Sequence, residues 1–329
     1  MPLSLKNKTT RLRKNPLLRS LVRETELNID DLIMPIFFKD GKGTEAVPSM
    51  PGINKFSSEC LLREAEALGK SGIKSILLFG SSPKKDSSGS SSYNEESQFH
   101  KAIKNIKKSS DLIIIADVCL CAFTDHGHCG IAKKTSGKNG AHLQIDDSKT
   151  AETLAKIAVS YAKAGADMVA PSAMANGQVK AIRETLDKNG FTDTSIISYS
   201  AKYASNFYGP FRGIYDSTPK GSDRKGYQMD FGNKREAIRE IFLDIEEGAD
   251  IVMVKPALSY LDIIQSIRDK VNIPIAAYNV SGEYSMVKAA HLKGWLDEKS
   301  VALEILQSIK RAGADIIISY WAKEATKWI

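Results

Sequence analysis

The sequence predicts an α/β protein, a (β/α)8 TIM barrel preceded by an N-terminal arm. Three observations favour this fold. Eight short apolar runs alternate with amphipathic helical patterns along the chain. The tripeptide Gly-Ala-Asp recurs at three places where a helical pattern gives way to an apolar run. Finally, side chains suited to catalysis follow several of the apolar runs, and barrel enzymes carry their active sites at the C-terminal ends of the strands.

The apolar runs are typical of parallel strands buried on both faces, because most are continuous and many of their residues are β-branched. A doubly wound open sheet is the alternative arrangement for such units. The number of strands favours the closed barrel. In chain order, the predicted strands cover residues 32–38, 75–80, 112–118, 168–170, 195–200, 251–254, 275–279 and 316–319.

Helical patterns separate the predicted strands, and three of them end at Gly165, Gly248 and Gly313, the first residues of the Gly-Ala-Asp tripeptides. Glycine suits a helix C-cap because it adopts the left-handed conformation readily. The unequal spacing of the tripeptides indicates a repeated βα unit rather than a solenoid. The clearest helical patterns cover residues 60–70, 150–164, 234–247, 259–270 and 299–311.

Residues 1–25 are predicted to form a basic arm, and residues 26–329 a single barrel domain. Seven of the 46 basic residues precede Glu24, and the other 39 balance the 39 acidic residues. A body with no formal net charge argues against a broad nucleic-acid-binding face. The arm has three interpretations: it packs on a neighbouring subunit, it is a solvated tail, or it is a transit sequence. It lacks the apolar core of a secretion signal.

Two segments lack helical or strand periodicity. Residues 81–92 are rich in serine and are predicted to form a mobile loop after the second strand. Residues 203–232 are dense in Gly, Pro, Tyr and Arg and begin directly after Lys202. Long loops in compact domains are usually lids or binding loops. We therefore predict an active-site lid at about residues 203–232, with a disordered surface insertion as the alternative.

The composition, 42% hydrophobic and 26% charged over 329 residues, is typical of a soluble globular protein. No apolar run reaches the roughly 18–20 residues that cross a bilayer. Four cysteines are too few for a disulfide scaffold, and three of them, Cys119, Cys121 and Cys129, lie within eleven residues. This pattern favours a reducing cytosol and a metal site.

Cys119 and Cys121 point the same way if their segment is extended, because they are two residues apart. A turn through His126-Gly127-His128 would return Cys129 to the same point. Three thiolates can hold zinc and leave a fourth position for water or substrate, which is typical of a catalytic site. A redox pair and plain buried thiols are the alternatives. His126 and His128 are alternative ligands or proton carriers.

Two lysines follow apolar runs directly. Lys202 ends Ser198-Tyr199-Ser200-Ala201-Lys202, and Lys255 ends Ile251-Val252-Met253-Val254-Lys255. Desolvation at the mouth of an apolar strand favours the neutral amine, and a neighbouring cation does the same. A neutral amine is the nucleophile that forms Schiff bases with ketones. Both lysines fall on the same predicted barrel rim.

These segments resemble the porphobilinogen synthase (5-aminolevulinate dehydratase) family. The similarity extends from Arg11 to Trp321, nearly the whole chain, and several long motifs in one order make it highly specific. The motifs are Asp117-Val118-Cys119-Leu120-Cys121, His126-Gly127-His128-Cys129-Gly130, Ser200-Ala201-Lys202-Tyr203-Ala204-Ser205 and Met253-Val254-Lys255-Pro256, with Asn15-Pro16, Pro171-Ser172-Ala173-Met174, Tyr208-Gly209-Pro210-Phe211-Arg212, Asp223-Arg224-Lys225 and Tyr227-Gln228-Met229.

The resemblance implies an asymmetric condensation of two 5-aminolevulinate molecules to porphobilinogen, with loss of two waters, in tetrapyrrole (heme and chlorophyll) biosynthesis. Lys255 and Lys202 would form imines with the substrates that supply the propionate and the acetate sides, respectively. Asp117 would relay protons beside the metal that the cysteines hold. The resemblance also implies which residues bind the substrate carboxylates: Arg212, Arg224 and Gln228 for one, and Ser281 and Tyr320 for the other.

The resemblance further implies a catalytic zinc held by Cys119, Cys121 and Cys129, which would act as a Lewis acid on the second substrate. Relatives that lack zinc carry aspartates at these positions, so the cysteines place the chain in the zinc-using branch. Glu240 matches a family position near a peripheral, activating magnesium; a glutamate in a helix-surface ion-pair network is the alternative. The implied assembly is a homo-octamer in which the arm wraps a neighbouring barrel.

A cytoplasmic lyase that acts on a small molecule, with no membrane or nucleic-acid partner, is therefore the main interpretation. A Schiff-base aldolase with one reactive lysine and structural zinc is a second. A zinc-stabilised binding protein whose basic arm contacts nucleic acid is a third, and the neutral body argues against it.

Overall fold

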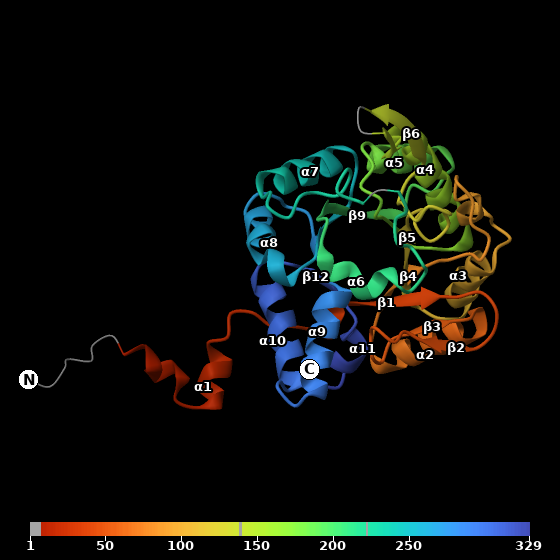
Figure 1. Cartoon of the computed structure of the whole chain (residues 1–329). Helices are drawn as coiled ribbons and strands as arrows, with labels where there is room; N and C mark the ends of the chain where they lie inside the picture. The colour runs from red at the N-terminus through yellow and green to blue at the C-terminus, as the bar shows by residue number, and fades with distance from the viewer. Residues whose placement is uncertain (1–7, 138–139, 222) are drawn as a thin grey trace, which may run out of the picture.

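Eight parallel strands close into a barrel in the computed structural model, which describes residues 8–137, 140–221 and 223–329 (Figure 1). Each strand pairs with the next, and β12 pairs with β1 to complete the ring. The strands are β1 (Leu32–Phe38), β4 (Ser75–Phe79), β5 (Ile113–Val118), β8 (Met168–Pro171), β9 (Ser195–Lys202), β10 (Ile251–Lys255), β11 (Ile275–Asn279) and β12 (Ile316–Ser319).

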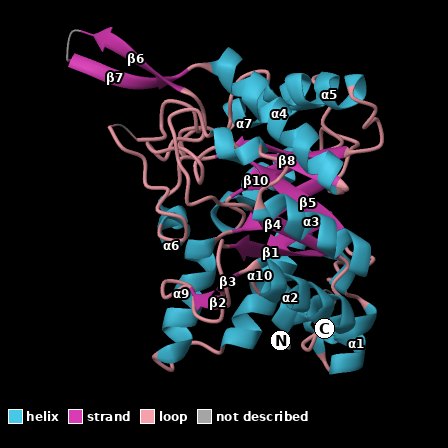
Figure 2. Ribbon diagram, turned by 90° about the vertical axis from the view of Figure 1, so that its right-hand side faces the viewer, coloured by secondary structure: helices cyan, strands magenta, loops and turns pink. Residues whose placement is uncertain are grey.

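The predicted (β/α)8 barrel is thus confirmed, and the observed strand ends lie within two residues of the predicted ones. Helices surround the ring, as Figure 2 shows from the side. They are α2 (Ser58–Ser71), α3 (Gln98–Ser109), α4 (Asp147–Ala164), α5 (Gln178–Lys188), α7 (Arg235–Glu246), α8 (Leu261–Arg268), α9 (Ser281–Leu292), α10 (Glu298–Arg311) and α11 (Ala322–Ala325).

The three Gly-Ala-Asp tripeptides have the same structural role. Gly165, Gly248 and Gly313 all have positive φ, from 103° to 113°, so glycine is required at each helix end. The aspartate that follows accepts a hydrogen bond from the first residues of the preceding strand in the ring. The pairs are Asp167 with Ile114 N (2.9 Å), Asp250 with Ile196 N (2.7 Å) and Asp315 with Ile275 N (2.8 Å).

Replacing Asp315 by alanine should destabilise the barrel by roughly 1–2 kcal/mol, because Ile275 N–H loses its acceptor and Arg268 Nη1 loses its ion-pair partner. Chemical denaturation measures this free energy of unfolding. The matched control is Asp111→Ala, since Asp111 is exposed just before β5 and should change stability by less than about 0.5 kcal/mol. Equal effects of the two substitutions would show that the aspartate contributes nothing as a strand cap.

Two antiparallel hairpins were not predicted from the sequence. β2 (Thr44–Ala46) and β3 (Asn54–Phe56) extend the ring beside β1, and β6 (Ala132–Gly137) pairs with β7 (Gly140–Ile145). The first pair has only three residues a strand, too few for a period to show. The second projects from one end of the molecule in Figure 2.

The described part of the arm, residues 8–25, extends away from the barrel (Figure 1). It contains a 3-10 turn (Thr9–Arg13) and the short helix α1 (Pro16–Leu21), neither of which has a buried residue. Leu17 and Leu21 are 82% and 80% exposed. Apolar side chains gathered on an exposed helix favour packing against another molecule over a solvated tail.

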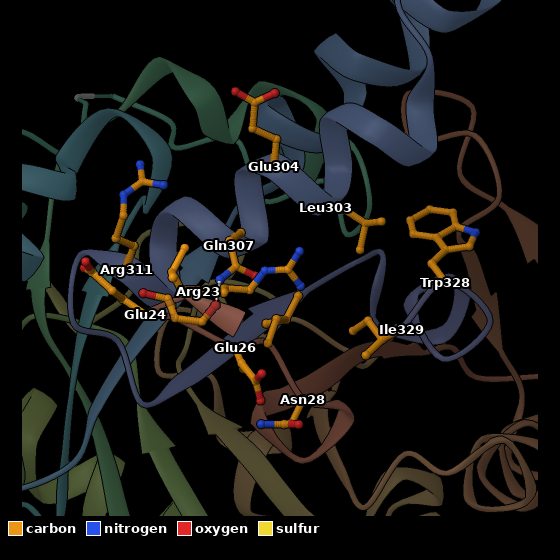
Figure 3. Close-up of a pocket in the computed structure, with 13 residues that line it drawn as sticks. Arg23, Glu24, Glu26, Asn28, Leu303, Glu304, Gln307, Arg311, Trp328 and Ile329 are labelled. Atoms are coloured by element: carbon orange, nitrogen blue, oxygen red, sulfur yellow. Dashed lines mark hydrogen bonds between the residues drawn. The ribbon is translucent and has the colours of Figure 1, made fainter. Parts of the chain in front are cut away.

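A cavity of about 820 Å³ lies where the arm meets the barrel. Residues 22–28 form one side, and α10 with Trp328 and Ile329 forms the other (Figure 3). Gln307 Nε2 donates to Thr25 O across this junction at 2.5 Å. This cavity contains none of the predicted catalytic residues.

The serine-rich loop 81–92 has a defined turn in the structure. Asp86 accepts hydrogen bonds from the backbone and hydroxyl groups of Ser88 and Ser90, and residue 86 bridges to Thr124. The predicted mobility of this loop stays a prediction. Among the helices of the described residues, none combines the length and apolar character that crossing a bilayer requires.

Candidate active site

A small enclosed cavity of about 30 Å³ lies at the C-terminal ends of the barrel strands. The structure brings most of the predicted site residues to its wall. Lys202, Lys255, Cys119, Cys121, Asp117, Arg224, Ser281 and Tyr320 line it, together with Phe79, Ser172, Tyr208, Phe211, Tyr278 and Val280. These residues lie in the last positions of β4, β5, β9, β10 and β11, in the first positions after β5, β8, β11 and β12, and in the segment after β9.

A β-bulge turns Lys202 into this cavity. Val252 pairs with Ser198, but Val254 pairs with Ala201, so β9 has one residue more than β10 at this point. An extra residue reverses the alternation of side chains. Tyr199 and Lys202 therefore both face the interior, although they are three residues apart, and Lys202 pairs with Lys255 on the next strand.

The bulge is supported from outside the barrel by Asp244 on α7. Ser198 Oγ donates to Asp244 Oδ2 at 2.6 Å, and Ser200 Oγ donates to Ser198 O at 3.3 Å. Both serines are fully buried. Burial raises the pKa of Asp244 to about 6. The sequence pattern did not reveal Asp244, because a polar residue on a surface helix carries no sign of what it faces.

Lys255 lies among aromatic rings. Its Nζ is 4.1 Å from the centroid of the Tyr278 ring and 4.9 Å from that of Tyr199, with Tyr208 and Phe211 within 5.5 Å. Burial and, after it, the charge of Lys202 together lower the pKa of Lys255 to about 7. An amine with this pKa is substantially neutral at physiological pH, as Schiff-base formation requires.

Lys202 and Asp117 are two further charged residues in the wall of the small cavity. Lys202, 5% exposed, donates to Ser172 O. Burial raises the pKa of Asp117 to about 6, while the charges of Lys202 and Lys255 oppose the rise. A carboxyl that titrates near neutrality beside two amines is suited to proton transfer.

The three cysteines converge, as predicted. The Sγ atoms of Cys119, Cys121 and Cys129 all lie within 4.8 Å of one another, and the first two are 3.5 Å apart. Cys119 Sγ donates to Cys121 Sγ, and the neighbouring thiols of both residues lower the pKa of Cys129 despite its burial. Among the described residues, this is the one cluster of potential ligands with that spacing.

Both histidines have partners other than the cysteines. His128 Nδ1 lies 3.2 Å from Tyr227 OH, and its Nε2 lies 3.2 Å from Lys220 O. His126 Nδ1 accepts from His128 N at 3.1 Å, and its Nε2 lies 3.3 Å from Ser87 O. The alternative that either histidine ligates a metal therefore receives no support from this geometry.

The segment after β9 covers the cavity. Tyr215 OH lies 2.8 Å from Phe38 O and 2.9 Å from Phe79 O, at the ends of β1 and β4. Lys85 Nζ donates to Tyr215 O at 2.8 Å. These hydrogen bonds join the segment to the barrel, unlike a disordered insertion. That it opens and closes as a lid stays a prediction.

Two guanidinium groups of this segment lack carboxylate partners. Arg224, 7% exposed, donates to Gly127 O (3.0 Å) and Ser217 O (2.6 Å), and no ion pair links Arg212 or Arg224 to an acid within the described ranges. Burial and the charge of Arg224 lower the pKa of Arg212. Neighbouring cations without a counterion are suited to an anionic substrate.

Gln228 and Glu240 line a separate cavity of about 330 Å³ on the other side of this segment. Gln228 is 3% exposed, and its backbone N–H donates to Arg224 O. Glu240 lies near Glu236, and burial together with that charge raises the pKa of Glu240. Neither side chain belongs to the wall of the smaller cavity.

Several buried polar atoms at this end of the barrel have no hydrogen-bond partner within the part of the chain that the structure describes. Five of the seven such atoms belong to Asp117, Tyr199, Arg212, Arg224 and Gln228. Buried polar groups are normally satisfied. Asp117 and Arg224 line the small cavity, so their unpaired atoms indicate a site there that a polar ligand completes.

Comparison with known proteins gives the family. A model of the delta-aminolevulinic acid dehydratase family matches residues 6–328. The chain belongs to the delta-aminolevulinic acid dehydratase family. It is 52% identical to the Halalkalibacterium halodurans delta-aminolevulinic acid dehydratase over 97% of this chain and 95% of that protein. The Bacillus subtilis relative is 50% identical over 98% of both chains.

A solved structure supports both family and fold. The delta-aminolevulinic acid dehydratase (porphobilinogen synthase) from Toxoplasma gondii ME49, in complex with the reaction product porphobilinogen, superposes with a TM-score of 0.93 at 46% identity. The match covers 98% of this chain and 91% of that one. Membership of the delta-aminolevulinic acid dehydratase family makes the chain a dehydratase of the lyase class.

The residues present fit the metal that such a site requires. Three sulfur ligands from one short segment, with the rest of the cavity open beside them, match an ion that keeps one position for a non-protein ligand. The partly ionised cluster around Cys129 supplies the negative charge that a divalent cation needs.

Proposed function

We propose that the chain condenses two 5-aminolevulinate molecules to porphobilinogen, with release of two waters, using lysine Schiff bases and a zinc ion held by Cys119, Cys121 and Cys129. One observation carries the proposal. Two buried lysines on adjacent strands share a cavity wall with two of the three clustered cysteines. An aldolase needs only one reactive lysine. The presence of Lys202 beside Lys255 therefore favours a reaction that joins two ketones.

Each residue has a role in this reaction. Lys255 attacks the ketone of the substrate that supplies the propionate side, and Lys202 that of the substrate for the acetate side. Each attack expels water and forms an imine, which acidifies the adjacent C–H bond. Asp117 takes up and returns protons, supported by its position beside both amines. The bound zinc supplies Lewis acidity for the second substrate.

The carboxylates of the two substrates are held at opposite ends of the cavity. Arg212 and Arg224, with Gln228 near them, bind one carboxylate through charge-assisted hydrogen bonds. The hydroxyls of Ser281 and Tyr320 bind the other. Closure of the lid, residues 203–232, would exclude water from the reacting carbons. The 30 Å³ of free space is too small for two substrates, so binding requires this segment or its side chains to move.

Glu240 is proposed to hold a peripheral, activating magnesium in the second cavity, where its neighbours include Glu236, Asp230 and Asp147. Oxygen ligands of this kind suit magnesium, which usually keeps several waters. We further propose a cytoplasmic homo-octamer in which residues 1–25 pack on a neighbouring barrel, since Leu17 and Leu21 are exposed on the arm.

The activity itself is the first test. Purified, zinc-loaded protein incubated with 5-aminolevulinate should yield a pyrrole whose mass equals two substrates less two waters, measured by mass spectrometry and by the colour reaction of pyrroles. Incubation with 4-oxopentanoate, which lacks the amine, should yield no pyrrole. Cleavage of an aldol without pyrrole formation, unaffected by chelation, would instead support the aldolase interpretation.

A further inference from the structure

Glu283 is a buried carboxylate to which no step of the proposed reaction assigns a role. It lies in the first turn of α9 with 0% of its surface exposed. Its Oε1 accepts from Leu258 N at 2.8 Å, and its Oε2 accepts from Val280 N and Asn279 Nδ2, both at 2.9 Å. Within the described ranges no lysine or arginine forms an ion pair with it, so N–H dipoles at the start of α9 offset its charge.

A helix cap alone would account for only one of these contacts, the one with Val280 N. The bond to Leu258 N reaches the loop after β10, and the bond to Asn279 reaches the last residue of β11. Asn279 Oδ1 in turn accepts from Ser319 Oγ at 3.0 Å, and Ser319 Oγ accepts from Trp321 N at 3.2 Å. One carboxylate thus joins the ends of three consecutive strands.

Each of these three ends carries a residue of the proposed site. Lys255 is the last residue of β10, three positions before Leu258. Ser281 directly follows Val280, and Tyr320 lies between Ser319 and Trp321. Inside the cavity, Tyr278 links two of these residues, since Lys255 Nζ lies over the Tyr278 ring and Tyr278 OH is 3.1 Å from Tyr320 OH.

We propose that Glu283 is the positioning residue that holds the imine-forming Lys255 at a fixed separation from Ser281 and Tyr320, so that one substrate is bound by its ketone and its carboxylate at once. This inference rests on the proposed function. Polar networks with every member buried tolerate little displacement, because a partly satisfied network is costly. Glu283, Asn279 and Ser319 are all fully buried.

The proposal separates two classes of ketone. To be trapped efficiently, a keto acid must reach the Lys255 amine and the hydroxyls of Ser281 and Tyr320 at the same time. A ketone without a carboxylate needs only the amine. In both cases the amine adds to the carbonyl, water leaves, and borohydride reduces the resulting C=N bond to a stable secondary amine. Loss of register should therefore slow the trapping of the keto acid far more than that of the plain ketone.

The experiment compares 4-oxopentanoate with 2-butanone as borohydride-trapped probes of full-length, zinc-loaded protein. Glu283→Gln keeps the shape but presents an amide NH₂ to N–H donors. We expect its trapping of 4-oxopentanoate at Lys255 to fall by about 10²-fold and that of 2-butanone by less than about threefold. Glu59→Gln, the same change in the exposed first turn of α2, is the control and should alter neither rate.

Ser319→Ala keeps the carboxylate and breaks the far end of the network, so it should show the same selective loss to a smaller extent, roughly 10-fold. If Glu283→Gln does not fold, the Ser319→Ala variant provides the test of the inference instead. A folded variant that traps both probes like the wild type, or loses both equally, would overturn the inference. Wild-type protein that traps neither probe would instead contradict the proposed function, which is a different result.

Discussion

Replacing Lys255 by alanine is expected to abolish porphobilinogen formation, with kcat falling by at least about 10³-fold. In the proposed reaction this amine is the nucleophile that forms one of the two imines, and among the described residues around it only Lys202, on the neighbouring strand, offers a second amine. The measurement is the rate of pyrrole formation at saturating 5-aminolevulinate.

Lys288→Ala is the matched control for this substitution. Lys288 is partly buried and, like Lys255, lies over a tyrosine ring, 5.2 Å from the centroid of Tyr284, but it pairs with Glu298 outside the cavity. It should lower stability only, leaving kcat within about twofold of wild type. A Lys255→Ala protein with wild-type kcat would contradict the proposal that Lys255 forms an imine with substrate.

The pH dependence of imine formation follows from the same amine. Because burial and then Lys202 lower the pKa of Lys255 to about 7, the neutral fraction rises as pH rises through 7. Trapping at Lys255 should therefore increase between about pH 6 and 8 and then level off. In Lys202→Met, one cause of the low pKa is gone, so the midpoint should shift to higher pH.

The second large effect that we expect is the loss of activity when the metal site is disrupted. Cys129→Ala should abolish stoichiometric zinc binding, measured by elemental analysis, and reduce pyrrole formation by about 10²-fold or more. The pKa of Cys129 is lowered whereas those of Cys119 and Cys121 are raised, so its loss removes the cysteine whose thiolate form is most favoured. A chelator should have the same effect on wild-type protein, and added zinc should reverse it.

Cys60→Ala supplies the control for the cysteine substitution, since Cys60 is the one other cysteine and lies on α2, away from the cluster. It should retain both zinc and activity. A Cys129→Ala protein that is fully active after exhaustive chelation would contradict the role of the thiolates.

The barrel could be predicted from the sequence because each strand is a short, continuous apolar run, and burial on both faces demands such a run wherever a parallel strand occurs. The Gly-Ala-Asp repeat marked helix ends correctly, since positive φ requires glycine there. The strand cap made by Asp315 and its counterparts was missed, because hydrogen bonds to another strand leave no local pattern.

The convergence of Lys202, Lys255 and the cysteines was also predictable, since all follow strands whose ends meet at one rim. Their orientation was not. Regular alternation would place Tyr199 and Lys202 on opposite faces, and only the register shift between β9 and β10 turns both inward. The hydrogen-bond network of Glu283 could not be predicted from the sequence, because a glutamate in the first turn of a helix is an ordinary cap.

The sequence motifs also did not separate the two cavities. Gln228 and Arg224 are close in sequence, yet Arg224 lines the small cavity and Gln228 the larger one beyond it. The segment between β9 and α7 lacks regular periodicity, so the direction of each side chain depends on long-range contacts such as that of Tyr215 with Phe38.

The most direct test of the shared cavity is borohydride reduction of the zinc-loaded enzyme during turnover of 5-aminolevulinate, followed by peptide mapping. We expect a substrate adduct on the peptide that contains Lys255, with a second adduct on Lys202 under saturating substrate. In Cys129→Ala the Lys255 adduct should persist while pyrrole formation falls, because the metal acts on the second substrate. Full pyrrole formation with Lys255 and Lys202 both unmodified would contradict the proposed reaction.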